Sequence, residues 1–330
     1  MALMLGDQAL RDAIGMGEAI DLLERTFTHD AAGKTSISPK FVSDFEGGAM
    51  RILFASDAGS GYCAIKAYHS ILGVGTRYVV SLYRMSDGEL LAVLDAQRIT
   101  DLRTGAASGV IARRIPLPAP VSVGIIGSGH QACTQLESLA TVYRVTSAAV
   151  YSPTPAHRSA YAHAMSERLG IPVIATDSAE AAVRGREVVA AASSSRSREP
   201  VLRGAWLDRC RLLCAVGNTR AQFAEVDIEC FRDAALTVVD TPHAFEEAGE
   251  LRQAIAGGAL PEARRATLSR IVTGAVNVPR EGRIVFKSVG SALQDLALAA
   301  RYYELLRARE GLPSAPDVGS LKRPVSAGGA

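Results

Sequence analysis

The sequence predicts an α/β protein in which a doubly wound parallel sheet follows a smaller α+β domain with an antiparallel sheet. Three observations lead to this prediction. Short runs of β-forming residues alternate with glycine-containing turns over 34–95. From residue 121 onward, strand-like and helical segments alternate, which is typical of a parallel sheet with right-handed crossovers. Between them, the segment 116–120 contains three prolines and marks a junction.

In the first part of the chain, an apolar stripe with helical spacing predicts a helix over 17–32. A second helix is predicted over 99–114, where small residues would let it approach another backbone closely. The predicted strands between these helices are 36–42, 50–54, 62–68, 78–83 and 90–94. We expect residues 1–118 to form a domain for substrate binding and dimerisation.

The second part, 119–297, is expected to be a dinucleotide-binding domain of the Rossmann type. Its predicted strands are 121–126, 148–152, 171–175, 187–192, 212–216, 236–240 and 284–289, and its predicted helices are 129–143, 155–169, 178–184, 225–232, 245–257 and 290–310. The last helix is long and apolar, so its part from about 298 to 312 is expected to pack on the first domain. The tail 313–330 is rich in Pro, Ser, Gly and Ala, which predicts disorder.

Composition excludes several classes of protein. A chain of 330 residues with 48% hydrophobic and 21% charged residues is typical of a globular protein with two domains. A net charge of +2, with arginines scattered among acids, argues against nucleic-acid binding. No apolar run approaches the roughly 20 residues of a membrane span, and no secretory signal is evident, so a cytoplasmic protein is expected. The cysteines have no metal-ligand spacing and predict small buried side chains rather than a metal site: Cys63, Cys133, Cys210, Cys214 and Cys230.

A glycine-rich turn follows the strand predicted at 121–126. Gly127 permits a tight turn, Gly129 lets the backbone approach a pyrophosphate, and Ala132 keeps the next helix close to the sheet. The helix N-terminus supplies N–H donors for the phosphates. The cofactor-binding segment is therefore predicted to comprise Gly127, Ser128, Gly129, His130, Gln131 and Ala132.

The end of the second strand of the dinucleotide domain indicates which nucleotide is bound. An Asp or Glu at this place binds the ribose 2′-hydroxyl of NAD, but residues 150–158 contain neither. Ser152 and Thr154 have hydroxyls that suit a 2′-phosphate, and Arg158 follows within one helical turn. NADP(H) is therefore favoured over NAD(H), although a simple helix-start turn that accepts either nucleotide is the alternative.

Isolated cations among apolar residues are the candidate substrate-binding groups. Strand alternation places Lys66 on the opposite face from Ile65, and Arg103 lies in an otherwise small and apolar helix. A buried cation needs an anionic partner, and a substrate carboxylate is as plausible a partner as a structural ion pair. Lys40 and Arg51 are further candidates.

Four separated motifs together resemble the ornithine cyclodeaminase/mu-crystallin family over residues 5–310. They are Ile99-Thr-Asp-Leu-Arg-Thr-Gly-Ala-Ala-Ser108, the glycine turn, Leu213-Cys-Ala-Val-Gly217 and Val285-Phe-Lys-Ser-Val-Gly-Ser-Ala-Leu-Gln-Asp295. The resemblance implies a homodimer paired through the N-terminal sheets and an active site between the domains. It also implies that Lys66, Arg103 and Lys40, a lysine in place of the usual arginine, bind a substrate carboxylate. It places the nicotinamide end of the cofactor near Ser193, Val216, Lys287, Ser288, Val289 and Gly290.

One position departs from the cyclodeaminase pattern. Cyclodeaminases have an aspartate two residues after the glycine at 217, whereas this chain has Thr219, which cannot act as a base at neutral pH. The sequence therefore predicts a reductase of a small imino acid, in which Lys66, with a lowered pKa, passes a proton and Thr219 positions a water or the imine nitrogen. Ornithine cyclodeaminase activity, with Glu225 or Asp227 as a relocated base, is one alternative. A non-catalytic NADPH-binding protein is the other.

Overall fold

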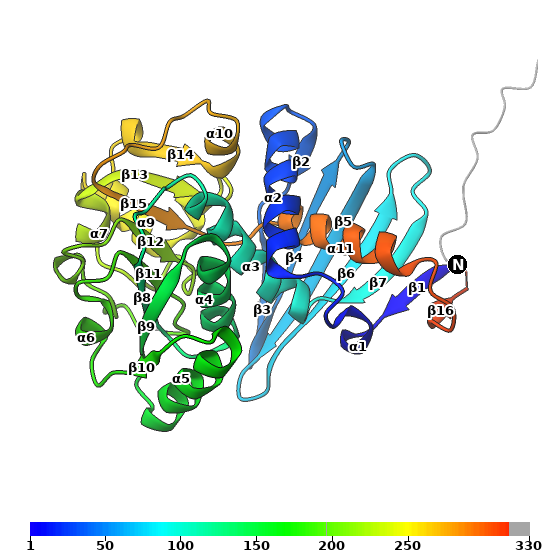
Figure 1. Ribbon diagram of the computed structural model, residues 1–330. Coiled ribbons are helices and arrows are strands. Elements are labelled where there is room, and N and C mark those ends of the chain that lie inside the picture. Colours follow the sequence, from blue (N-terminus) through cyan, green and yellow to red (C-terminus); the bar gives the residue numbers. More distant parts are fainter. Residues whose placement is uncertain (196, 317–330) are drawn as a thin grey trace, which may run out of the picture.

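The structure of the protein is a computed structural model that describes residues 1–195 and 197–316. It contains two eight-stranded sheets with helices between and around them (Figure 1). The first sheet is mainly antiparallel and the second is parallel throughout, which confirms the predicted α/β fold with two kinds of sheet. In the described part of the chain, no helix has the length and apolar character to cross a bilayer.

The first sheet has the strand order β16-β1-β7-β6-β5-β4-β2, with β3 also paired to β4. All its pairs are antiparallel except β1 with β7. The strands are β1 (Ala2–Leu5), β2 (Thr35–Ile37), β3 (Phe41–Phe45), β4 (Gly48–Asp57), β5 (Tyr62–Ile71), β6 (Gly75–Arg84), β7 (Leu90–Asp95) and β16 (Ser314–Ala315).

The two faces of this sheet have different surroundings because side chains alternate along each strand. The inner face packs against α2 (Met16–Ala31), α3 (Gln97–Ala112) and α11 (Ala292–Leu306). The outer face has large apolar side chains that are exposed in the single chain. Phe54 and Ile65, which pair directly across β4 and β5, are the clearest examples.

The second sheet has the order β10-β9-β8-β11-β12-β15-β13-β14. β9 and β10 lie on one side of β8, whereas the later strands lie on its other side, beginning with β11. Ligands of doubly wound folds bind at such a switch point, which here lies between β8 and β11. The strands are β8 (Val121–Ile126), β9 (Val145–Tyr151), β10 (Val173–Ala175), β11 (Val188–Ala191), β12 (Leu212–Ala215), β13 (Ala234–Val239), β14 (Arg265–Thr267) and β15 (Arg283–Lys287). The helices of this part are α4 (His130–Val142), α5 (Pro155–Leu169), α6 (Ala179–Val183), α7 (Glu229–Arg232), α8 (Ala244–Glu247), α9 (Gly249–Ala256) and α10 (Leu268–Val272).

The α3 helix joins the two halves of the molecule (Figure 1). Small residues let it approach its neighbours closely, as the sequence predicts. A Cβ on Gly105 would lie 2.5 Å from the carbonyl oxygen of Thr134 in α4, and one on Gly109 would lie 2.4 Å from Ile20 in α2. One continuous apolar core therefore extends from the first sheet through α3 into the second.

Several local predictions were wrong. The chain begins with β1 and a short helix α1 (Asp7–Leu10), neither of which the sequence indicated. The helix expected over 245–257 is interrupted at Ala248, and the one expected over 225–232 begins only at Glu229. The last helix starts at Ala292, and it packs on β4, β5 and β6 of the first sheet.

The expected disorder of 313–330 is wrong at its start. Residues 314–315 form β16, which adds to the free edge of β1, and the Met4 amide donates to the Pro313 carbonyl at 2.8 Å. A strand edge offers unpaired backbone groups, and they pair with a passing segment regardless of its composition. The remainder of this prediction, 317–330, lies outside the described residues.

The close contact between α3 and α4 leads to a prediction about stability. Gly105→Ala should lower the free energy of unfolding by about 1–3 kcal/mol, because its Cβ meets backbone that cannot move easily. Gly17→Ala in α2 is the matched control: its Cβ would have no neighbour nearer than 3.8 Å, so the higher helix propensity of alanine should stabilise by roughly 0.5–1 kcal/mol. Denaturant unfolding of both variants tests this, and equal effects of the two would contradict it.

Candidate functional site

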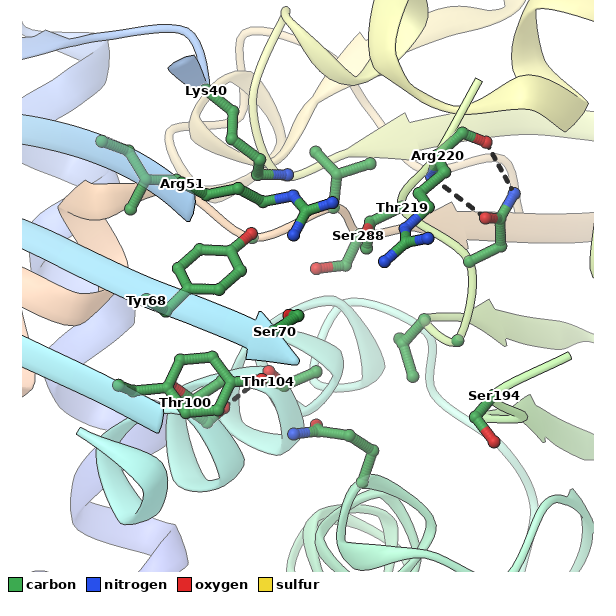
Figure 2. A pocket seen from close by; sticks show the side chains of 18 of the residues that line it. Lys40, Arg51, Tyr68, Ser70, Thr100, Thr104, Ser194, Thr219, Arg220 and Ser288 are labelled. Atoms are coloured by element: carbon green, nitrogen blue, oxygen red, sulfur yellow. Dashed lines mark hydrogen bonds between the residues drawn. The ribbon is translucent and has the colours of Figure 1, made fainter. Parts of the chain in front are cut away.

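A cleft lies between the two sheets and receives side chains from both. The first sheet and α3 contribute polar and charged groups, and the loops after β11, β12 and β15 form the opposite wall (Figure 2). Lys40, Arg51, Lys66, Arg103 and Thr219, which are the predicted substrate-binding and catalytic residues, all line this cleft.

Strand register explains why the cations meet. Leu53 pairs with Lys66 and Arg51 pairs with Tyr68 across β4 and β5, and Tyr68 pairs with Tyr78 on β6. Because the side-chain period of a strand is two, these residues share the inner face. Lys66 is 2% exposed whereas its neighbour Ile65 is 41% exposed, as the alternation predicts.

The centre of the cleft is a buried ion cluster of Lys66, Arg103 and Asp295. The Lys66 ammonium donates to Asp295 Oδ1 at 2.7 Å and to the Thr100 hydroxyl at 2.6 Å. Arg103 Nε lies 3.5 Å from the same Asp295 oxygen. Two cations therefore share one carboxylate, and the cluster has one positive charge more than it has negative charges.

Burial lowers the pKa of the Lys66 ammonium from its usual value to about 8. Asp295 opposes this effect by attraction and by its hydrogen bond, while Arg103 and Lys40 add to it by repulsion. The lowered pKa agrees with the sequence-based expectation. At neutral pH Lys66 is therefore mostly charged. Its pKa is close to the pH of the solution, and proton transfer by an acid is efficient under that condition.

Asp240, at the end of β13, holds the loop after β15. Its carboxylate accepts hydrogen bonds from the Ser288 hydroxyl at 2.6 Å, from the Val289 and Gly290 amides and from the Gln294 side chain. Gln294 in turn accepts from Arg103 at 3.3 Å. The loop and the Arg103 guanidinium are thus positioned together.

Gly290 permits this close packing. Its φ of +78° is in the left-handed region, and a Cβ there would lie 2.5 Å from the Arg103 guanidinium. Both the backbone angle and the space therefore require glycine.

Lys40 and Arg51 have different partners. Lys40 forms an ion pair at 2.9 Å with Glu247 of α8, which connects the two walls of the cleft. The Arg51 guanidinium lies 5.7 Å from the centre of the Tyr68 ring. In the described ranges, Arg51 forms no ion pair.

The loop 216–220 brings Val216, Thr219 and Arg220 into the cleft. It is held from behind, because the Gly217 amide donates to Glu225 and the Asn218 side chain donates to the buried Glu250. Lys287 completes this support with an ion pair at 2.9 Å to Glu250 and a hydrogen bond to the Asn218 carbonyl. Lys287 is fully buried and does not line the cleft, which argues against its predicted role as a cofactor contact.

The two acids considered as a relocated cyclodeaminase base, Glu225 and Asp227, both accept hydrogen bonds from backbone amides. Glu225 is 1% exposed and accepts from the Ser193 and Gly217 amides, and burial raises the pKa of its carboxyl. Asp227 accepts from the Gly204 and Cys230 amides. Neither carboxylate lines the cleft, because each is used to hold backbone.

The glycine-rich turn lies at the switch point of the parallel sheet. Gly127 has a φ of +105°, and a Cβ on it would lie 2.5 Å from the Ala192 carbonyl oxygen. No atom lies within 4 Å of the place where Gly129 would have a Cβ, so the turn has open space in front of α4. Gln131 lines the cleft, whereas His130 lines a second cavity, and Ala132 is buried against the sheet.

The expected binding site for the adenosine end lies beside this turn. The Ser128 hydroxyl donates to the Ser152 hydroxyl at 2.9 Å, and Thr154 precedes the first residue of α5. Arg158 donates to the Ser152 carbonyl and forms an ion pair at 2.6 Å with Asp177, whose side chain is fully exposed.

These features fit a dinucleotide. The turn leaves room for a phosphate to approach the backbone at Gly129, and the N-terminus of α4 begins directly after it. The switch point of the sheet lies beside the cleft. Ser193, just after β11, is held beside this region by Glu225, which accepts a hydrogen bond from the Ser193 amide. Ser194 and Ser195, which the sequence did not indicate, line the cleft beside it.

The structure adds residues that sequence reasoning missed. Asp295, Asp240 and Arg220 had no assigned role, although Asp295 lies within one of the four motifs. Tyr68 and Tyr78 line the cleft, while His69 points to the outer face.

Of the cysteines, Cys210, Cys214 and Cys230 are buried as expected, but Cys63 and Cys133 are half-buried. Within residues 1–195 and 197–316, no group of three or more metal-ligating side chains is placed to hold a metal ion.

Comparisons with known proteins agree with this geometry. A family model described as the ornithine cyclodeaminase/mu-crystallin family matches residues 2–310. An alanine dehydrogenase of Archaeoglobus fulgidus is 30% identical over 92% of this chain and 94% of its own. A Δ1-pyrroline-2-carboxylate reductase of Thermococcus litoralis, solved with NADH and L-proline, matches with a TM-score of 0.89 and 28% identity over 95% and 100% of the two chains. An archaeal alanine dehydrogenase dimer with bound NAD has a TM-score of 0.86 and 28% identity over 97% and 99%.

Asp295→Asn should destabilise the protein most at low pH. It leaves Lys66 and Arg103 without their shared carboxylate, and loss of one partner from a buried ion pair costs about 3–5 kcal/mol. The pKa of Lys66 should fall below about 8, because Asp295 favours the ammonium. Lys66 then deprotonates more easily in the folded than in the unfolded chain, so the free energy of unfolding rises with pH across this window. The deficit of the variant should therefore shrink from pH 6 to pH 9.

Thermal or denaturant unfolding across this pH range measures the effect. Glu167→Gln is the control, because Glu167 forms an exposed pair with His163 and its loss should change stability by no more than about 0.5 kcal/mol. A deficit of Asp295→Asn that matches the control, or that grows with pH, would show that the cluster is not a buried ion pair.

Proposed function

Because the chain belongs to the ornithine cyclodeaminase/mu-crystallin family, we propose that it reduces a small imino acid, a ketimine or a cyclic imine carboxylate, to an L-amino acid with NAD(P)H. It is an NAD(P)-dependent oxidoreductase of imino or amino acids, as its relatives are. The observation that supports the proposed reaction is the buried cluster of Lys66, Arg103 and Asp295, whose single excess positive charge matches one substrate carboxylate.

The cluster would bind and orient the substrate. A carboxylate next to Arg103 and Lys66 gains charge-assisted hydrogen bonds in a site with little water. Lys66 and Arg103 are held from behind by Asp295 and Gln294, so their positions require little reorganisation when the substrate binds. Binding through the carboxylate would direct the adjacent C=N group towards the loop with Val289 and Gly290, which lines the cleft and is the expected position of the nicotinamide.

Proton transfer is the second role of these residues. When bound, the reduced nicotinamide supplies a hydride to the imine carbon, and the electron pair of the C=N bond moves to the nitrogen. Lys66 donates a proton to that nitrogen and is reprotonated from solvent, since its pKa of about 8 keeps it charged at neutral pH. Thr219 lies on the facing wall and would hold the imine nitrogen or a water with its hydroxyl.

Loss of ammonia with ring closure is not supported by the same site. The carboxylate that lines the cleft in the described structure is Asp295, and its Oδ1 is shared by Lys66 and Arg103. Thr219 stands where a cyclodeaminase has an aspartate, so among the described residues no acidic side chain at this position can pair with a side-chain ammonium. These arrangements favour a reductase.

The nucleotide is a nicotinamide dinucleotide, and we propose NADP(H) as the preferred form. Residues 150–158 have no acid that would repel a 2′-phosphate. The Arg158 guanidinium is next to Ser152, and its pair with Asp177 is exposed, so the pair is worth no more than about 1 kcal/mol. A 2′-phosphate, with up to two negative charges, can take its place.

The oligomer proposed from the sequence is a homodimer through the first sheet. The outer face of that sheet exposes Phe41, Phe54, Ile65 and Val79, each more than two-fifths exposed in the single chain. Phe41 and Phe54 stack at 6.0 Å on this face. A contiguous apolar surface of this kind on an otherwise charged protein is typical of a protein interface.

The proposed reaction predicts oxidation of NADPH in the presence of Δ1-pyrroline-2-carboxylate, Δ1-piperideine-2-carboxylate or pyruvate with ammonia. Absorbance loss at the nicotinamide band measures it, and the same assay with NADH tests the cofactor. A tenfold lower Michaelis constant for NADH would contradict the NADP(H) proposal. Proline formation from ornithine, without turnover of any imine, would favour a cyclodeaminase, and nucleotide binding without any turnover would favour a non-catalytic protein.

Lys66→Met should reduce turnover by at least about 100-fold, the contribution typical of a general acid, while NADPH still binds. Nucleotide fluorescence titration measures binding separately from the rate. Parallel loss of binding and turnover would assign Lys66 to folding of the cleft instead.

The dimer proposal predicts that the wild-type protein has twice the 34.7 kDa mass of one chain in solution, and that Ile65→Lys is a monomer. A charge at the centre of the apolar face cannot be solvated in the interface. Ile174→Lys is the matched control, because Ile174 is 58% exposed on the other sheet. Sedimentation equilibrium distinguishes the two, and an unchanged mass for Ile65→Lys would exclude this interface.

A further inference from the structure

We propose that Thr100 is a positioning residue for the reduction, because its hydroxyl orients the Lys66 ammonium so that one N–H faces the cleft. This inference rests on the proposed role of Lys66 as proton donor. It adds a residue that acts through Lys66 rather than on the substrate. Thr100 lies in the first turn of α3 and lines the cleft on the same side as Tyr68 (Figure 2).

The hydrogen bonds of Thr100 can have only one direction. A charged lysine donates and cannot accept, whereas a backbone carbonyl accepts and cannot donate. The hydroxyl oxygen therefore accepts the 2.6 Å hydrogen bond from Lys66, and the hydroxyl hydrogen is used in the 2.6 Å hydrogen bond to the Ala96 carbonyl. Because both bonds are fixed in direction, an oxygen lone pair stays directed at the ammonium.

The Ala96 carbonyl also determines what Thr100 cannot do. Ala96 directly precedes α3, and its carbonyl accepts the Thr100 amide at 2.9 Å as well as the hydroxyl. The series of hydrogen bonds that starts at Lys66 therefore ends at a backbone oxygen, which has no proton to give. Thr100 orients Lys66 without relaying a proton to it, and Lys66 is reprotonated from the side of the cleft.

The three hydrogens of the ammonium have different uses. Among the described residues, Thr100 accepts one and Asp295 accepts another at 2.7 Å. The third remains for the substrate nitrogen. When its N–H bond breaks, the electron pair stays on Lys66, and the neutral amine keeps the two hydrogens that Thr100 and Asp295 accept. Proton transfer thus preserves both hydrogen bonds and requires little reorganisation.

The other described groups around the ammonium do not accept its third hydrogen. The rings of Tyr78 and Tyr68 lie 5.1 and 5.9 Å from the Lys66 nitrogen, and an aromatic face attracts a cation without fixing its hydrogens. Arg103 and Lys40 are cations themselves and lower the pKa of Lys66 by repulsion. The orientation of the ammonium is therefore set by its two hydrogen-bond acceptors.

The test removes the Thr100 hydroxyl and then restores it. The substrate is whichever of Δ1-pyrroline-2-carboxylate, Δ1-piperideine-2-carboxylate and pyruvate with ammonia the wild-type protein reduces fastest with NADPH. Thr100→Val keeps the branched shape but has no oxygen, so kcat should fall by at least about 10-fold. KM should change by less than about 3-fold, since Arg103 still binds the carboxylate. Thr100→Ser should restore kcat to within about 3-fold of the wild-type value.

The pH profile is a readout that a merely structural role would not change. The Thr100 oxygen stabilises the charged ammonium, so its loss should lower the pKa of Lys66 below about 8. The protonated form donates, so kcat falls as pH rises through this pKa. That fall should begin about one pH unit lower in Thr100→Val than in the wild-type protein or Thr100→Ser. Thr100→Ala, which removes the hydroxyl without adding volume, should repeat the change.

Thr26→Val is the matched control. Thr26 is 5% exposed, compared with 6% for Thr100, and its hydroxyl donates to the Leu22 carbonyl four residues earlier in α2, but it does not line the cleft. This variant should keep the wild-type kcat and pH profile. Equal losses of kcat in the two valine variants, or wild-type kcat and pH profile in Thr100→Val, would overturn the positioning role.

A measurement without turnover separates this inference from the proposed reaction. An NMR titration of protein with isotope-labelled lysine ε-carbons gives the pKa of Lys66, and Lys66→Met identifies its signal. The pKa should be near 8 in the wild-type protein and in Thr26→Val, and about one unit lower in Thr100→Val. If no imine is reduced but the pKa is lowered, the reaction is wrong and Thr100 still holds the ammonium. If imines are reduced but neither pKa nor kcat changes, the positioning role is wrong.

Discussion

The shared contact of Lys66 and Arg103 with the Asp295 carboxylate is the constraint on which the site depends. Two buried cations line the cleft, and one carboxylate oxygen lies 2.7 Å from Lys66 and 3.5 Å from Arg103. With a second carboxylate, the cluster would be neutral before a substrate arrives. Without Asp295, two like charges would repel in a low dielectric. The single excess charge is therefore the basis on which we propose that the cleft binds an anionic substrate.

A chain of hydrogen bonds connects this cluster to the parallel sheet. Asp240 at the end of β13 holds the loop of Ser288 and Gly290 and reaches Arg103 through Gln294. Arg103, which we propose binds the substrate, and the loop next to the expected nicotinamide are thus positioned by one carboxylate. The long helix α11 contributes to both, because it begins beside this loop and supplies Gln294 and Asp295 before it packs on the first sheet. In the proposed reaction, the position of the nicotinamide relative to the substrate carboxylate therefore depends on this helix.

Much of the fold was predictable because its signals are local. The alternation along β4 and β5, the apolar strand of β8 and the glycines of the turn each depend on a few neighbouring residues. The elements that were missed depend on partners distant in sequence. β16 forms because β1 has a free edge, and β1 pairs with β7 some ninety residues later. The break at Ala248 precedes Gly249, which packs closely on the backbone of Ala221 and Phe223, and this contact joins segments nearly thirty residues apart.

The sequence by itself determined the order of the two sheets, the dinucleotide turn, the inward face of Lys66 and the absence of an aspartate at Thr219. Each of these follows from residue type and short spacing. Only the tertiary structure decided which cations have counter-charges: Asp295 for Lys66 and Arg103, Glu247 for Lys40, and Glu250 for Lys287. Charge pairing acts through space, and these partners lie between 37 (Glu250 and Lys287) and 229 (Lys66 and Asp295) residues apart in the chain, so no local pattern contains them. The charged side chains of the cleft could therefore be identified from the sequence, but the ion pairs that they form depend on how the two sheets and their helices pack.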